Sequence, residues 1–148
     1  MSVTPFSALA GDDAQLVSVS IPAGMQIMPR MMFTQTWTFK NTGTTTWTAT
    51  QNGCTLNMRG MDSLGAIRMV ANTSGSTNAS HPKAIINSGT SVAPGGQASY
   101  SMIFITPETP GLVTDLFQLN SASSVFFGPT VSVQVVVMQA GKIGRAHV

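Results

Sequence analysis

One stretch of the sequence decides the fold class: Phe33-Thr34-Gln35-Thr36-Trp37-Thr38-Phe39-Lys40-Asn41-Thr42-Gly43-Thr44-Thr45-Thr46-Trp47-Thr48. Residues 33–39 alternate between the two faces of an extended strand, because successive side chains of a strand point in opposite directions. Phe33, Trp37 and Phe39 share one face, which only Gln35 interrupts, and threonines occupy the other. This pattern predicts a strand whose aromatic face lies in a core.

Turn signals and further alternating segments continue on both sides of this stretch. Asn41 and Gly43 tolerate the positive φ of a turn, and Asn52-Gly53 is a strong signal for a two-residue hairpin. The whole pattern predicts an all-β fold, an immunoglobulin-like antiparallel β-sandwich of about seven to nine strands, with aromatic side chains between two sheets about 10 Å apart. The expected strands are residues 14–21, 33–39, 45–50, 54–59, 67–70, 84–86, 97–105, 113–120 and 131–138.

Composition excludes several classes of protein. The chain has 148 residues, which suits a single domain, and only 8% of them are charged, against about 25% in average domains. A net charge of +2 is too weak for a nucleic-acid footprint. No apolar run reaches the length of about 18 residues that a transmembrane helix needs, and no signal peptide is visible at the N-terminus. We therefore expect no nucleic-acid partner and no membrane insertion.

Groups that could support catalysis are few and scattered. Cys54 is the only cysteine, which rules out an internal disulfide and multi-cysteine metal sites, and we expect it to be a small buried strand residue. His81 lacks a second ligand at metal-binding spacing. Asp115 shares the inward face of its strand with Val113 and Phe117, so it is either solvated at a sheet edge or hydrogen-bonded to backbone N–H groups. We expect no enzyme, no metal and no cofactor.

Several motifs follow one another in order between residues 14 and 137. They are Ile21-Pro22-Ala23-Gly24-Met25, residues 33–48, Val92-Ala93-Pro94-Gly95, Thr106-Pro107-Glu108-Thr109-Pro110-Gly111, Phe126-Phe127-Gly128 and a final run of alternating valines. In this order they resemble the four-tryptophan domain in its bacterial or viral form. That domain is an immunoglobulin-like sandwich best known as the central domain of the next-to-breast-cancer-gene-one autophagy receptor. The residues that match its signature are Trp37, Asn41, Gly43, Trp47, Pro94, Gly95, Pro110, Gly111, Phe117, Phe127 and Gly128.

The chain departs from this family at two places. It has two tryptophans instead of four, Trp37 and Trp47, and Phe117 stands at the third position. Arg30 follows Pro29, where the family usually has a glycine. Because a phenylalanine can replace a tryptophan in a core, the resemblance still implies the same fold.

The resemblance implies a non-catalytic recognition or spacer module. The leading hypothesis is a structural or protein-interaction module of a larger microbial surface, secreted or viral assembly, whose partner is another protein or a neighbouring domain. The family context likewise implies a location at the cell surface, in the secreted fraction or in a virion. The alternative is a carbohydrate-binding accessory module, which would need exposed aromatic rings. Trp37 and Trp47 separate the two, because buried rings favour the scaffold and exposed coplanar rings favour sugar stacking.

Methionines crowd the segment that precedes the Trp37 strand. Met25, Met28 and Met31 lie within seven residues, and the chain has 10 methionines in total. They either fill an irregular end of the core or form an adaptable hydrophobic surface for a partner. The second interpretation fails if all three side chains are fully buried.

The two ends of the chain are expected to lie outside the domain. Residues 1–13 are predicted to be a tail, residues 14–139 the domain and residues 140–148 a non-native tail. The segment 142–148 resembles the translation of a short-read sequencing adapter, which would make the chain a metagenomic fragment. Without Lys142 and Arg145 the chain has five basic and five acidic residues, so its domain carries no net charge.

Overall fold

The computed structural model describes residues 11–50, 52–59, 68–72 and 83–139. This part of the chain forms nine β-strands and no helix. The strands are β1 (Ala14–Val19), β2 (Met25–Ile27), β3 (Met32–Asn41), β4 (Thr55–Arg59), β5 (Arg68–Asn72), β6 (Lys83–Ala84), β7 (Gln97–Ile105), β8 (Gly111–Asn120) and β9 (Phe126–Val137).

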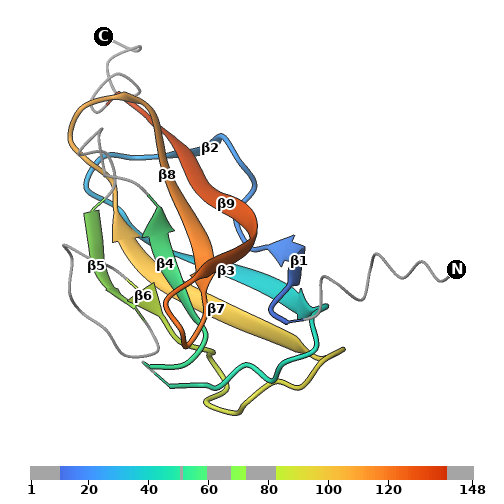
Figure 1. The fold of residues 1–148 in the computed structure, drawn as a ribbon. Helices are drawn as coiled ribbons and strands as arrows, with labels where there is room; N and C mark the ends of the chain where they lie inside the picture. Colours follow the sequence, from blue (N-terminus) through green and yellow to red (C-terminus); the bar gives the residue numbers. More distant parts are fainter. Residues whose placement is uncertain (1–10, 51, 60–67, 73–82, 140–148) are drawn as a thin grey trace, which may run out of the picture.

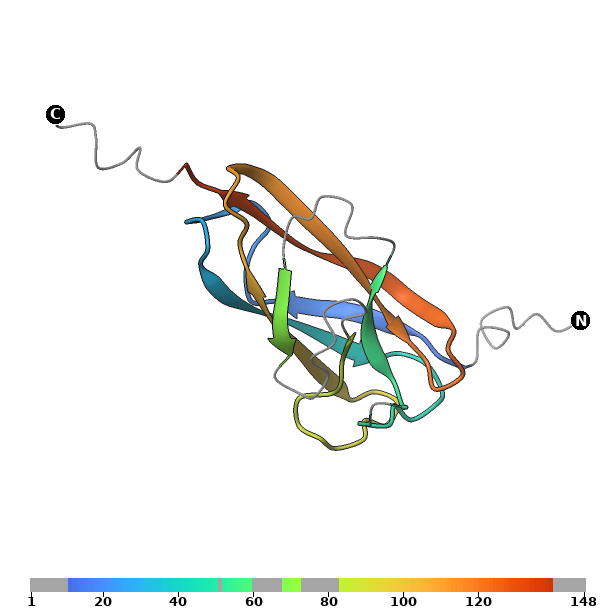
Figure 2. The same ribbon diagram turned by 90° about the vertical axis from the view of Figure 1, so that its left-hand side faces the viewer.

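The strands form two sheets that pack face to face (Figures 1 and 2). One sheet has the order β1-β3-β7-β5, and the other has the order β2-β9-β8-β4-β6. All neighbouring strands are antiparallel except β2, which runs parallel to β9. The predicted all-β immunoglobulin-like sandwich is therefore confirmed.

The core lies between the inward faces that the alternation predicts. Trp37 and Phe39 are fully buried on β3. Gln35, which precedes them on the same face, is 1% exposed. The Gln35 side chain is satisfied, because its Oε1 accepts the Ile21 backbone N–H at 3.0 Å. The neighbouring strand β7, which pairs with β3 in the same sheet, buries Ala98, Tyr100, Met102 and Phe104, as its alternation predicts.

Two of the expected elements around Trp47 are wrong. Residues 45–50 do not form a strand, and Trp47 makes only an isolated bridge to Val92. The backbone there is held by a side chain instead, since Asn41 Nδ2 donates to the Thr45 carbonyl at 2.9 Å. A turn does form at residues 52–53, but β4 then pairs with β8 and β6, so no hairpin returns along residues 45–50.

Strand β2 is an element that the alternation does not predict. The chain leaves the first sheet after β1 and joins the second, where Gly24 N–H donates to the Gln134 carbonyl at 2.9 Å and β2 aligns with β9. The other boundaries shift by a few residues: β6 ends at Ala84, and β9 already begins at Phe126. β1 is an edge strand of the first sheet, and β2 is an edge strand of the second. The two strands lie one after the other along an outer edge of the sandwich (Figure 1).

The predicted tails lie mostly outside the described residues, which exclude 1–10 and 140–148. Gly11 and Asp13, at the end of the predicted N-terminal tail, accept backbone hydrogen bonds from Thr44 at 2.8 Å and Thr42 at 3.2 Å. His81 is also outside the described residues. No helix with the length and apolar character to cross a membrane occurs in the described ranges.

Candidate interaction surface

Met25, Met28 and Met31, named here the methionine surface, lie at one end of the sandwich. Met25 is on the edge strand β2 and is 42% exposed, and Met31 is 48% exposed in the loop before β3. Met28, between them, is half-buried. Because the three side chains are not fully buried, this segment is still available as a binding surface, and that interpretation stays a prediction.

A single buried threonine fixes the loop that carries these methionines. Thr106, which is 2% exposed, donates its hydroxyl to the Met28 carbonyl at 2.6 Å and accepts the Met31 N–H on the same oxygen at 2.9 Å. Its backbone N–H also donates to the Met31 carbonyl at 3.0 Å, and its carbonyl accepts the Arg30 N–H at 3.2 Å. The methionines are therefore presented on a loop with a defined shape. Sequence reasoning missed Thr106, whose only local signal is its position before Pro107.

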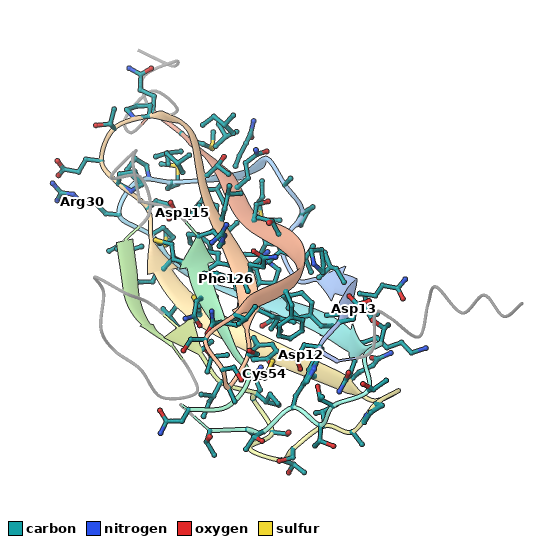
Figure 3. The ribbon with its side chains drawn as sticks, viewed as in Figure 1. Asp12, Asp13, Arg30, Cys54, Asp115 and Phe126 are labelled. Atoms are coloured by element: carbon teal, nitrogen blue, oxygen red, sulfur yellow. The ribbon has the colours of Figure 1, made fainter. Side chains whose placement is uncertain are left out.

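Further apolar and charged side chains surround this end. Met32 and Leu112 are 56% and 59% exposed, at the start of β3 and near the start of β8. Arg30, which lies in the loop itself, forms an exposed ion pair with Glu108. Figure 3 places Arg30 at this end of the molecule, away from Cys54. An apolar centre with a polar rim is the usual anatomy of a protein–protein interface.

The aromatic signature residues are core residues. Trp37 and Trp47 are 0% and 1% exposed, so neither can stack on a sugar. Phe117, at the predicted third aromatic position, is fully buried with its ring centroid 5.1 Å from that of Trp37. Trp37 Nε1 donates to the Ser132 carbonyl at 3.1 Å. Phe127, next to the positive-φ Gly128, packs on Trp47 with 5.9 Å between ring centroids.

Asn41 organises the polar part of the signature. It is fully buried, and its Nδ2 donates to the carbonyls of Thr45 at 2.9 Å and Val92 at 3.1 Å. Its Oδ1 accepts the Gly43 N–H at 3.1 Å, and its backbone carbonyl accepts the Gly95 N–H at 2.7 Å. Pro94 lines a shallow surface hollow beside it, and Pro110 lies in the turn before β8. These residues hold loops together, and this part of the signature is structural.

Three glycines of the signature have a backbone reason to be glycine. Gly95, Gly111 and Gly128 have φ values of 91°, 135° and 73°. A side chain in this left-handed region is strained, whereas glycine adopts it readily. Arg30 also has a positive φ, of 57°, although it carries a side chain. The glycine that the family usually has after Pro29 is thus explained by the backbone.

The ionisable groups Cys54, Tyr100 and Asp115 are buried in the core. Cys54 is buried directly before β4, and burial raises the pKa of its thiol to about 12. The Tyr100 hydroxyl donates to the Cys54 carbonyl at 3.0 Å, and burial raises the pKa of Tyr100 above its ordinary value. Asp115 is 4% exposed on the inward face, as its alternation predicts, which excludes the solvated alternative. Among the described residues, no three His, Cys, Asp or Glu side chains come together as a metal site.

Comparison with known proteins identifies a family. A family model described as the Ig-like domain from next to BRCA1 gene matches residues 20–137. A search of curated proteins finds no match.

Two solved structures are similar at a distance. Spo0M, a sporulation control protein from Bacillus subtilis, is 13% identical to this chain with a TM-score of 0.44. The match covers 87% of this chain and 49% of Spo0M, so this chain spans about half the length of Spo0M. AvmM, which catalyses macrocyclization in alchivemycin A biosynthesis, is 10% identical with a TM-score of 0.45, over 88% of this chain and 90% of AvmM. Likenesses this distant carry no information on what the chain binds.

Proposed function

Because this chain belongs to the family of Ig-like domains from the next to BRCA1 gene, we propose that it is a non-catalytic module that binds another protein through the methionine surface. The observation that carries this proposal is the exposure of Met25 and Met31 on a loop fixed by Thr106. Methionine is flexible and polarisable, so a few exposed methionines can adapt to an apolar partner. A loop of fixed shape reduces the entropy that is lost when the partner binds.

Charge supports the same type of partner. An ion pair of Arg30 and Glu108 lies beside the methionines, and its two charges cancel. The partner segment is therefore apolar at its centre and needs no net charge. We propose further that the module is the bacterial or viral form of the four-tryptophan domain and acts within a larger microbial surface, secreted or viral assembly. The sequence of the flanking gene tests that setting, because it shows whether such domains are attached.

Selection of peptides from a displayed random library tests the binding surface. We expect enriched peptides to be apolar, and we expect the double variant Met25→Lys/Met31→Lys to weaken their binding at least about tenfold, because each lysine places a charge at the apolar centre. Val125→Lys is the matched control, since Val125 is 59% exposed in the turn between β8 and β9 at the other end of the sandwich. Peptides that bind the double variant as tightly as the native chain would refute the methionine surface.

A further inference from the structure

A polar pocket of about 180 Å³ lies at the end of the sandwich opposite the methionine surface. β9 begins beside this pocket at Phe126, whose partner on β8 is Asn120, and it ends at Val137 beside β2. In Figure 1 the turn between β8 and β9 lies next to the beginning of β4. The side chains that line the pocket and bear polar groups are Asn52, Thr55, Asn57, Asn120, Ser121 and Ser124.

The lining side chains have hydrogen-bonding capacity that the protein does not use. Within the described part of the chain, the amides of Asn52 and Asn120 and the hydroxyl of Ser124 bond to no other group. Asn57 Oδ1 accepts the Thr55 hydroxyl at 2.6 Å, which leaves the two N–H groups of its amide nitrogen. Each asparagine amide can donate twice and accept at its oxygen. Three such amides therefore converge on one small volume.

The walls of the pocket are fixed by the backbone. Ser121 Oγ accepts the N–H groups of Ser123 at 3.2 Å and Val125 at 3.3 Å, so its own hydroxyl hydrogen remains available. On the other wall, a Cβ added to Gly53 would lie 2.1 Å from the Thr48 carbonyl oxygen, so this turn is closely packed. Because the backbone of these walls is fixed, little backbone entropy is lost when a ligand binds.

The chemistry of the lining selects a neutral ligand. None of the lining side chains is charged, so the pocket itself offers no counter-ion for a phosphate or carboxylate and no carboxylate for a metal ion. We propose that the polar pocket binds one residue of a neutral sugar, whose hydroxyl groups both donate and accept hydrogen bonds.

Binding here differs from sugar stacking on an aromatic platform. Phe126 is the nearest ring by register, as the Cα partner of Asn120. The Arg59 guanidinium lies over this ring, 4.2 Å from its centroid, and so occupies one of its two faces. Recognition therefore rests on the asparagine amides and the serine hydroxyls, and specificity for the positions of sugar hydroxyls follows from their geometry.

Titration of the ¹⁵N-labelled chain followed by NMR tests the proposal. The probes are glucose, galactose, mannose and N-acetylglucosamine, with glycerol and inorganic phosphate as controls. We expect at least one sugar to shift the side-chain amide signals of Asn52, Asn57 and Asn120 saturably, with a Kd on the order of 1 mM. Glycerol and phosphate should leave these signals unchanged.

Single variants connect the signals to the pocket. Asn120→Ala should weaken binding at least about tenfold, because a sugar hydroxyl that bonds to the Asn120 amide is left without its partner. Asn57→Ala should have a similar effect, and the remaining spectrum reports whether each variant is folded. Gln26→Ala is the matched control, since Gln26 is an exposed amide on β2 at the opposite end. No saturable shift with any sugar, equal shifts with glycerol or phosphate, or full binding by folded Asn120→Ala would each overturn the proposal.

Discussion

The two tryptophans predict a measurable asymmetry in stability. Trp37 and Trp47 are equally buried, at 0% and 1% exposure, but only Trp37 has a partner for its indole N–H, the Ser132 carbonyl at 3.1 Å. Within the described residues, Trp47 Nε1 is buried without a hydrogen-bond partner. Replacing each tryptophan with phenylalanine removes the same atoms from the core and therefore the same packing, at a cost of about 2 kcal/mol.

The hydrogen bonds then separate the two variants. Trp37→Phe also removes a hydrogen bond, which adds about 1 kcal/mol, so we expect a total loss of about 3 kcal/mol. Trp47→Phe removes an unsatisfied buried donor and regains about 1 kcal/mol of its desolvation penalty, so we expect a loss of about 1 kcal/mol. The predicted difference of about 2 kcal/mol is a large fraction of the stability of a domain of this size.

Urea unfolding followed by circular dichroism measures both values. An unchanged slope of the unfolding free energy against urea would show that the unfolded states are comparable. Each variant also retains one tryptophan, so the fluorescence of the remaining indole checks that its surroundings are native. If Trp47→Phe destabilises the chain as much as Trp37→Phe, the unpaired N–H has no energetic consequence and the reasoning fails.

Three further predictions concern the backbone and a buried thiol. Arg30→Gly should raise the urea midpoint of unfolding. A glycine relieves the strain of the left-handed backbone (about 1–2 kcal/mol), which exceeds the loss of an exposed ion pair (about 0–1 kcal/mol). A lower midpoint would contradict the strain argument. Gly43→Ala should destabilise the chain by about 2 kcal/mol in the same assay. The added Cβ would lie 2.1 Å from the Gly11 carbonyl oxygen and would detach residues 11–13, which bond to residues 42–44. A loss of stability well under about 1 kcal/mol would count against this argument. The Cys54 thiol holds its proton more tightly in the folded chain, so the unfolding free energy should fall as the pH rises from the ordinary thiol pKa of 9.0 toward about 12. Cys54→Ala should reduce the slope of the unfolding free energy against pH in this range. An unchanged slope would show that the thiol does not contribute.

Long central strands could be predicted from the sequence because one face of each is buried. β3 follows its alternation closely and β7 departs from it at the buried Ser101 alone. Even the inward Gln35 on β3 and Asp115 on β8 are where the period of two places them. The alternation of apolar and polar residues within such a strand is enough to predict it, so no knowledge of distant residues is needed. The same holds for β8, whose inward face includes Phe117.

The failures arise where a contact other than the alternating pattern decides the structure. Residues 45–50 alternate like a strand, but Asn41 binds the carbonyl of Thr45 and leaves Trp47 with a single bridge. β2 is only three residues long and exists because β9 offers it a parallel register. Of the candidate sites, the methionine segment was visible because its residues are close in sequence. The polar pocket was not, since Asn52 and Asn120 are far apart in the chain and each resembles an ordinary loop residue.

The use that the protein makes of its side-chain hydrogen-bonding groups separates the structural residues from the candidate binding residues. Asn41, Gln35 and Thr106 are buried, and their side chains bond to backbone groups of loops and edges, which fixes the fold but leaves little for a ligand. Asn120 and Asn57 keep donors that the protein does not use, although they lie outside the signature motifs. Because the signature specifies the sandwich and not its surfaces, chains with the same signature can carry different sites at the two ends. The function of this chain therefore has to be tested at the methionine surface and the polar pocket, where substitutions alter binding groups without removing the contacts that hold the sandwich together.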